Sequence, residues 1–191
     1  MLNLVLFGKP GSGKGTQANF LKDKYDLIHI STGDVFRKNI KNQTELGVKA
    51  QGYTQNGELV PDDVTVSMLE NEIKQNLPCN GFIFDGFPRT LNQADEMNKI
   101  LSKYKMELSA IVALEVDDDL LTDRLLKRGL ISGRSDDQSR EKILTRLNEY
   151  RNKTEPLIDY YIKINRFHSV SGVGEINEIS SRLLELIESV R

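Results

Sequence analysis

A glycine-rich loop near the start of the chain holds the residues best suited to chemistry. Residues 8–17 read GKPGSGKGTQ, in which Gly8, Gly13 and Lys14 match the spacing G-x-x-x-x-G-K. The glycines let the backbone curl so that several N–H groups point at one centre, and Lys14 supplies a mobile cation for the outer phosphates of a nucleotide. The loop predicts binding of a nucleoside phosphate, but it does not say what happens to the phosphate.

The segments on either side of the loop support this interpretation. Residues 2–7 are an apolar run typical of a buried strand, and residues 14–25 follow a helical pattern. A phosphate-binding loop requires this order of strand, loop and helix, because the N-terminus of the helix adds the positive end of its dipole. The alternative is a glycine-rich turn before an ordinary helix. Such a turn would not require a strand directly before the motif and a helix directly after it, and this chain has both.

Six arginines fall at or after predicted strand ends, or around residues 129–137: Arg37, Arg89, Arg124, Arg128, Arg134 and Arg146. A guanidinium group can bind two phosphate oxygens at once, although a single arginine on a helix is more often solvated. Two phosphates about 4 Å apart repel by roughly 4 kcal/mol at an effective dielectric constant of 20. The arginines therefore predict a site for two phosphorylated ligands, in which positioning and charge stabilisation suffice because a phosphate oxygen is already an anionic nucleophile.

One carboxylate is placed to hold a metal ion. Asp85 ends a predicted strand and is the candidate ligand for Mg²⁺ through water, with a cap or a turn as the alternative role. The two histidines, His29 and His168, lie within predicted strands, where a structural role is expected.

The composition limits the class of protein. The 191 residues carry a formal net charge of −2, whereas a nucleic-acid-binding protein usually has an excess of basic residues. One cysteine, Cys79, excludes an internal disulfide and a zinc site built from several cysteines. The sequence has no apolar run long enough for a membrane span and no basic leader, so we expect a cytoplasmic protein with neither membrane nor nucleic-acid partners.

Strands and helices alternate along the chain. Apolar runs predict strands at residues 2–7, 27–30, 81–85, 109–116 and 167–170. This alternation indicates an α/β fold with a five-stranded parallel sheet and helices on both faces. Residues 31–60 form a helical excursion after the second strand, where open α/β sheets place ligands.

The C-terminal third should be mostly helical. We expect a helix at 117–128, a polar loop at 129–137 and a long helix at 138–165 that Pro156 kinks or divides. A closing helix is expected from residue 175.

Six motifs, in the order found here, resemble those of adenylate kinases and together cover nearly the whole chain. They are GKPGSGKGTQ, STGDVFR, GELVPD, DGFPRTLNQA, RLLKRG and SGRSDD. The hydroxyl residue usual directly after the lysine is displaced by one place to Thr16, which is characteristic of that family. The resemblance implies a P-loop three-layer sandwich in one domain over 1–191, with a moving NMP-binding part at 31–60 and a short lid at 128–138. It also implies a monomer that catalyses reversible, Mg²⁺-dependent phosphoryl transfer from ATP to AMP, giving two ADP.

The resemblance also implies site residues. The ATP-binding residues would be Gly11, Ser12, Gly13, Lys14, Gly15, Thr16, Arg128 and Gly174. The AMP-binding residues would be Thr32, Arg37, Glu58, Leu59, Val60, Gly86, Phe87, Pro88, Arg89, Gln93, Arg134 and Arg146. The catalytic residues would be Lys14, Arg89, Arg124, Arg134 and Arg146. The family often has a cis peptide bond before the proline of this motif, which is Phe87–Pro88 here.

The lid implied by the resemblance is short. Some relatives have a long lid that holds zinc with cysteines, and because this chain lacks both the insertion and the cysteines, no zinc is expected. Leu130 and Ile131 place apolar side chains where polar ones are common in the family. Asp136 and Asp137 are expected either to latch the lid or to lie in a solvated turn.

Two other functions stay open when only the residues are considered. Uridylate/cytidylate kinases share the short lid and most motifs, but they tend to have Ala and Asn where this chain has Thr32 and Gln93. The amide of Gln93 can read a base edge, and both residues fit adenine. The second alternative is a regulatory protein that binds nucleotides without turnover, against which Lys14 and the six arginines argue.

Overall fold

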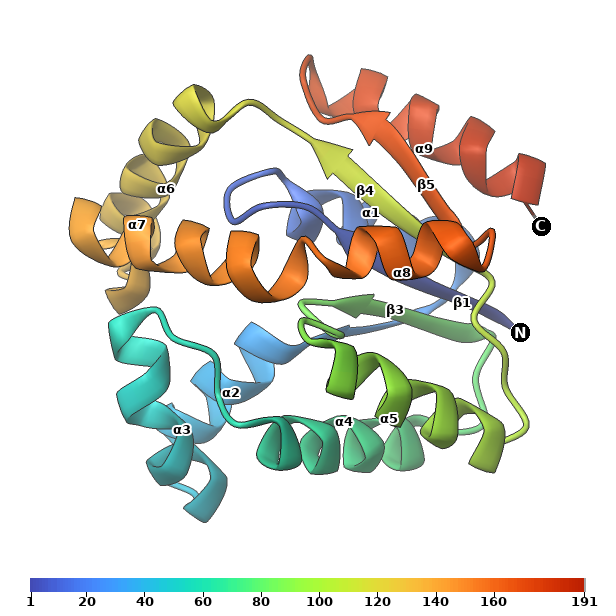
Figure 1. Ribbon diagram of the computed structural model, residues 1–191, viewed down its shortest axis with the longest axis horizontal. Helices are drawn as coiled ribbons and strands as arrows, with labels where there is room; N and C mark the ends of the chain where they lie inside the picture. The colour runs from blue at the N-terminus through green and yellow to red at the C-terminus, as the bar shows by residue number, and fades with distance from the viewer. Residues whose placement is uncertain (191) are drawn as a thin grey trace.

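The computed structural model describes residues 1–190 and has a five-stranded parallel sheet at its centre (Figure 1). The strands are β1 (Leu2–Phe7), β2 (Ile28–Ser31), β3 (Gly81–Asp85), β4 (Ala110–Glu115) and β5 (Phe167–Ser171). They lie in the order β2-β3-β1-β4-β5, and every pairing is parallel. The predicted sheet is confirmed, and its carboxyl ends all meet at one edge.

Helices cover both faces of the sheet, which confirms the three layers (Figure 1). One face packs against α1 (Lys14–Tyr25) and α9 (Ile176–Val190). The other face packs against α4 (Asp62–Asn76), α5 (Leu91–Lys103) and α8 (Leu157–Lys163). Within residues 1–190, no helix is both long enough and apolar enough to cross a bilayer.

The sheet divides the core in two because successive side chains of a strand point to opposite faces. Leu4 and Leu6 of the central strand pack with α1 and α9, whereas Val5 and Phe7 pack with α4, α5 and α8. All four side chains are buried, so the strand is apolar without alternation, as a strand covered on both sides must be. The loop that follows β1 is therefore anchored in the buried core of the molecule.

Two helices leave the carboxyl edge of the sheet after β2. They are α2 (Thr32–Lys41) and α3 (Glu45–Asn56), and each begins with a side-chain oxygen, of Ser31 or Thr44, that accepts a hydrogen bond from a backbone N–H of the first turn. A small hydrophobic cluster joins these helices to α4, and its buried members are Phe36, Ala50, Val60 and Met68. Residues 31–60 are thus a mainly helical unit beside the edge of the sheet, and it shares a small hydrophobic cluster with α4.

Gly47 allows α2 and α3 to touch. A Cβ at this position would lie 2.2 Å from the carbonyl oxygen of Asn39, which belongs to the backbone and cannot move aside. We expect Gly47→Ala to push the helices apart and to lower the free energy of unfolding by about 1–3 kcal/mol, the usual range for overpacking.

Gly52→Ala on the same helix is the matched control for Gly47→Ala. A Cβ on Gly52 would meet nothing within 4 Å, so alanine should raise the free energy of unfolding by up to about 1 kcal/mol through its helix propensity. Denaturant unfolding of both variants measures the two changes. If both variants changed the free energy of unfolding by the same amount and in the same direction, the close contact at Gly47 would not be the cause of the loss.

The helix before the expected lid loop is longer than the sequence predicts. The prediction that a polar loop starts at Gly129 is wrong, because α6 runs over Asp118–Ser132. A 3₁₀ turn, η1 (Ser135–Asp137), follows it. Gly129 serves packing, since a Cβ on it would lie 2.5 Å from the carbonyl oxygen of Asp137. The helix ends at Gly133, whose φ of 65° is the left-handed conformation that favours glycine.

The long helix expected at 138–165 is divided at Pro156, as the sequence predicts. The segments are α7 (Arg140–Glu149), a π-helical turn η2 (Tyr150–Thr154) and α8. A proline has no N–H to donate and its ring clashes with the preceding turn, so the helix cannot continue unchanged. The division lets α7 pack on α6 while α8 packs on the sheet.

Candidate active site

The loop after β1 forms a backbone cradle at the carboxyl edge of the sheet. Gly11 and Gly13 have φ values of 89° and 98°, a backbone conformation that is unfavourable for any residue with a Cβ atom. Gly13 is the N-cap of α1. The first residues of α1, Lys14, Gly15 and Thr16, line the adjoining cavity. The first N–H groups of a helix have no partner within it, so this end of α1 suits an anion.

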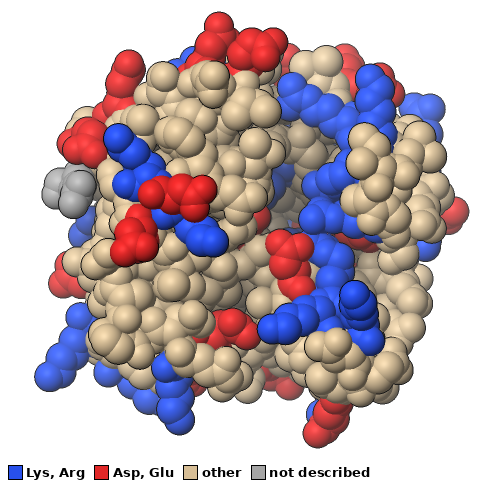
Figure 2. Space-filling model, turned by 180° about the vertical axis from the view of Figure 1, so that it is seen from behind, with Lys and Arg blue, Asp and Glu red and all other residues tan. Residues whose placement is uncertain are grey.

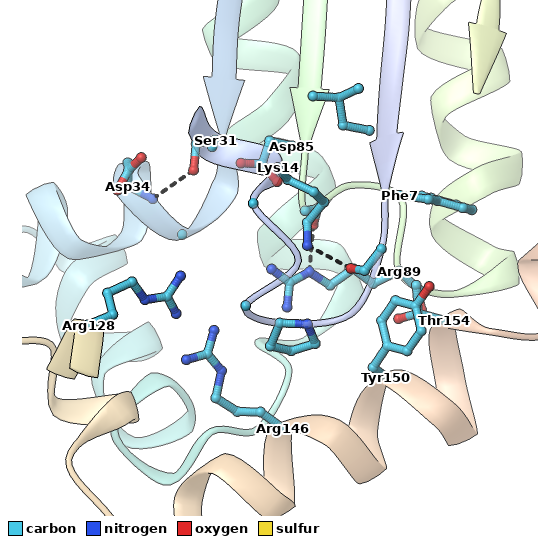
Figure 3. Close-up of a pocket in the computed structure, with 18 of the residues that line it drawn as sticks. Phe7, Lys14, Ser31, Asp34, Asp85, Arg89, Arg128, Arg146, Tyr150 and Thr154 are labelled. Atoms are coloured by element: carbon cyan, nitrogen blue, oxygen red, sulfur yellow. Dashed lines mark hydrogen bonds between the residues drawn. The ribbon is translucent and has the colours of Figure 1, made fainter. Parts of the chain in front are cut away.

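The ammonium group of Lys14 lies inside the curve of the loop (Figure 3). Its Nζ donates hydrogen bonds to the carbonyl oxygens of Gly8 at 2.6 Å and Lys9 at 3.0 Å. Burial lowers the pKa of Lys14 to about 8, although the negative charge of Asp85 opposes this effect. The charged form of Lys14 is therefore disfavoured where it stands, and an anion bound beside it would favour that form again.

Asp85 ends β3 and lines the same cavity as Lys14 (Figure 3). Burial alone would raise the pKa of Asp85, but the neighbouring His29 and the charges of Lys14 and Arg89 hold it below its ordinary value. The Nε2 of His29 lies 3.6 Å from Oδ2 of Asp85 and has no hydrogen-bond partner within residues 1–190. His29, which the sequence suggested to be structural, thus reaches the cavity.

A cavity of about 510 Å³ extends from the loop to the arginines (Figure 3). All six arginines singled out in the sequence line it: Arg37, Arg89, Arg124, Arg128, Arg134 and Arg146. Burial lowers the pKa of Arg89 and that of Arg146, yet a guanidinium group stays charged at any ordinary pH. Such partly desolvated cations attract an anion more strongly than solvated ones.

Basic side chains are also visible from outside. Seen from behind, Lys and Arg side chains gather along a hollow in the surface, with acidic side chains among them (Figure 2). The net charge of the chain is close to zero, so this gathering is a local feature of the fold.

Two aspartates of the segment at 128–138 hold arginines of the cavity. Asp137 is fully buried and accepts hydrogen bonds from Arg128, from Nε at 2.7 Å and from Nη2 at 3.1 Å. Arg146 pairs with Asp137 and, at 2.7 Å, with Asp136. Of the two roles expected for these acids, a solvated turn is excluded, because both carboxylates are engaged by arginines that line the cavity.

Asp34 is a further acid that the sequence analysis did not identify. It pairs with Arg37 on the same helix and lies 3.6 Å from Arg134, which belongs to the segment at 128–138. The three-residue spacing of Asp34 and Arg37 was the one available signal in the sequence. In the structure Asp34 joins the 31–60 unit to the segment at 128–138.

A second cavity of about 240 Å³ adjoins the first beside α2. Most residues that the resemblance assigns to AMP line it: Thr32, Arg37, Glu58, Leu59, Val60, Gly86, Arg89, Gln93 and Arg146. Its wall also includes the apolar side chains of Phe36 and Ile40. Apolar walls with a few polar groups are typical of a pocket for an aromatic base.

Three of the expected site residues lie outside both cavities. Ser12 and Phe87 are buried behind the loops that contain them, and Gly174 lies after β5. The expected cis peptide bond Phe87–Pro88 is confirmed, and a second one, Leu77–Pro78, has no signal in the motifs.

Comparison with known proteins agrees with this geometry. A family model described as adenylate kinase matches residues 6–166. The chain is 55% identical over 190 residues to the adenylate kinase of Flavobacterium psychrophilum and 54% identical over 190 residues to that of Flavobacterium johnsoniae. It is 46% identical over 191 residues to the adenylate kinase of Parabacteroides distasonis, and in all three cases 100% of both chains is covered. The site combines a phosphate cradle with six arginines, and these relatives match the chain along its whole length. The chain therefore belongs to the adenylate kinase family.

Proposed function

We infer that the protein is an adenylate kinase, which transfers a phosphoryl group reversibly from ATP to AMP and gives two ADP. The observation that carries this function is the pair of adjoining cavities. One begins at the phosphate cradle, the other has apolar walls suited to a base, and both include Arg89 and Arg146. Two nucleotides can therefore meet at a shared set of cations.

We propose the following places for the two nucleotides. The phosphates of ATP lie on residues 11–16 and against Arg128, with the adenine towards Gly174. AMP occupies the second cavity, with its base near Thr32 and Gln93, and the phosphate-binding side chains lie at the boundary of the cavities. The lining of the cavities supports the places of the ATP phosphates and of AMP, because Arg37, Arg89 and Arg146 line both cavities, whereas the place of the ATP adenine rests on the resemblance alone.

The chemistry that these residues supply is positioning and charge stabilisation. The acceptor oxygen of a monophosphate is already anionic, so no group is needed to remove a proton from it. Lys14 follows the transferred phosphoryl group, whereas Arg134 and Arg146 flank it and Arg124 neutralises charge nearby. Preorganised cations of this kind stabilise the transition state without reorganising during the reaction.

Mg²⁺ would accompany ATP in this proposal. The ionised carboxylate of Asp85 fits a magnesium ion that is held mainly by phosphate oxygens and water. No group of three or more His, Cys, Asp and Glu side chains suited to a metal occurs within residues 1–190. Bound Mg²⁺ would supply neutralisation of phosphate charge.

We also propose that two parts move relative to the sheet, the NMP-binding part at 31–60 and the lid at 128–138. The first part supports this division because its helices α2 and α3 pack in a small cluster distinct from the two clusters on the faces of the sheet, and this cluster is shared with α4. The contact of Asp34 with Arg134 would then join the two parts when they approach. The resemblance to the family further suggests a cytoplasmic monomer.

The lowered pKa of Lys14 predicts how activity depends on pH. The free enzyme loses the Lys14 proton as the pH rises through about 8, whereas bound phosphates restore a higher pKa. We expect kcat/KM for ATP to fall above this pH while kcat is maintained further, because kcat/KM reports the free enzyme. Initial rates across the pH range measure both profiles, and a kcat/KM that stays level as kcat falls would contradict the assignment.

The same group predicts the sign of a stability change. In the unfolded chain Lys14 has the ordinary lysine pKa of 10.5, so between pH 8 and 10.5 the unfolded chain binds more protons than the folded one. The contribution of Lys14 to the free energy of unfolding therefore rises with pH in that window. Unfolding of the wild type and of Lys14→Met at several pH values isolates this contribution.

The function is tested by a panel of acceptors. ADP formation from ATP is measured with AMP, CMP, UMP and GMP, and AMP is expected to give the highest kcat/KM. Faster turnover with CMP or UMP would favour a uridylate/cytidylate kinase. Binding of ATP and AMP without turnover would favour a regulatory role.

A further inference from the structure

We propose that Asp62 determines the base specificity of the AMP site by holding the amide of Gln93 in one orientation. This inference rests on the proposed function, because it concerns the base of the acceptor nucleotide. Asp62 is the first residue of α4, whereas Gln93 lies in the first turn of α5 and lines the second cavity. The two residues are brought together by the packing of α4 and α5 on the same face of the sheet.

Both ends of the Gln93 amide are engaged. Gln93 as a whole residue is only 2% exposed, its Oε1 accepts a hydrogen bond from the backbone N–H of Arg89 at 2.8 Å, and its Nε2 donates to Oδ1 of Asp62 at 2.6 Å. An ionised carboxylate can only accept and a backbone N–H can only donate. Turning the amide over would place oxygen against the carboxylate and NH₂ against the N–H, so two attractive contacts would become repulsive.

Asp62 is itself held in place. Its second oxygen, Oδ2, accepts hydrogen bonds from Oγ1 of Thr90 at 2.8 Å and from Nδ2 of Asn92 at 3.1 Å. Oγ1 of Thr90 in turn accepts a hydrogen bond from the backbone N–H of Gln93 at 3.1 Å, and this bond caps the start of α5. The carboxylate therefore has a fixed position relative to the helix that carries Gln93.

A fixed amide distinguishes two kinds of base edge. After its contacts with Asp62 and Arg89, Gln93 has one N–H and one oxygen lone pair left. Adenine presents a ring nitrogen that accepts and an amino group that donates, whereas hypoxanthine presents a ring N–H that donates and a carbonyl oxygen that accepts. A freely turning amide could pair with either base, but a fixed one matches a single pattern. Because cations hold the phosphate of the nucleotide, the base cannot turn over to compensate.

The test compares AMP with inosine monophosphate, whose base is hypoxanthine, as acceptors. Asp62→Asn keeps the size of the side chain but can donate as well as accept, so it removes one of the two restraints on the Gln93 amide and leaves only the N–H of Arg89 to oppose its turning. We expect the ratio of kcat/KM for inosine monophosphate to kcat/KM for AMP to rise by about tenfold, within the discrimination that a bidentate base contact provides. Most of the change should come from weaker use of AMP.

Asp63→Asn is the matched control. Asp63 is the next residue, is exposed, and carries the same charge in the same helical turn. Its substitution should leave the ratio unchanged, which separates the contact with Gln93 from the loss of a charge at the start of α4. Melting temperatures of all variants record whether each one is folded.

Asp62→Ser is the second variant, in case the asparagine disturbs folding. It also removes the carboxylate, and serine is tolerated at the start of a helix. A folded enzyme without the Asp62 carboxylate that keeps the wild-type ratio would overturn the proposal. Failure of the wild type to use AMP would instead contradict the proposed function, so the two failures are distinguishable.

Discussion

Replacing Lys14 with alanine is expected to lower kcat by about 10²–10³-fold, the range seen when one preorganised group that stabilises transition-state charge is removed. The ammonium lies inside the loop, where it donates to the carbonyl oxygens of Gly8 and Lys9. It is flexible enough to follow a phosphoryl group, and its charge becomes more favourable when anions arrive. The loss should therefore appear mainly in turnover rather than in the KM for ATP.

The measurement is the rate of ADP formation at saturating ATP and AMP. Lys22→Ala is the control, because Lys22 is an exposed lysine on the same helix, α1. Lys22→Ala should keep the wild-type rate. A Lys14→Ala enzyme within a few-fold of the wild type would show that this lysine does not act on the transferred group.

Replacing Arg89 with alanine is expected to lower kcat/KM for AMP by about a hundredfold, while the KM for ATP changes little. The guanidinium of Arg89 is held by its own chain, since Nε donates to the carbonyl oxygen of Gly86 at 2.7 Å. This contact leaves its Nη groups for an anion at the boundary of the two cavities. A charge-assisted hydrogen bond contributes about 1.5–3 kcal/mol, so the loss of one or two of them with one residue accounts for the expected effect.

Arg89→Lys separates charge from geometry. Lysine retains the positive charge but lacks the planar fork, so we expect kcat/KM for AMP between those of the wild type and Arg89→Ala. Arg140→Ala is the control, because Arg140 is exposed at the start of α7. Equal losses for ATP and AMP in Arg89→Ala would contradict its assignment to the AMP side.

The sequence by itself predicted the sheet, the phosphate cradle and the set of arginines. All five predicted strands are present, and their ends differ from the predicted ones by at most one residue. Such features are local: a strand covered on both faces must be apolar along its length, and a cradle needs glycines at fixed spacing between a strand and a helix. The division of the last long helix at Pro156 is local for the same reason, because it follows from the missing N–H of one residue.

Only the tertiary structure decided where α6 ends and which acidic residues contact the side chains that line the two cavities. Gly129 looks like a helix end in the sequence, but it is small because the backbone of Asp137 packs against it, and the helix continues to Ser132. Asp137 is separated from Arg128 and Arg146 by nine residues each way, and Asp62 is 31 residues from Gln93. A carboxylate in a turn or at the start of a helix has a sufficient local explanation, so its true partner becomes visible only when packing brings distant segments together.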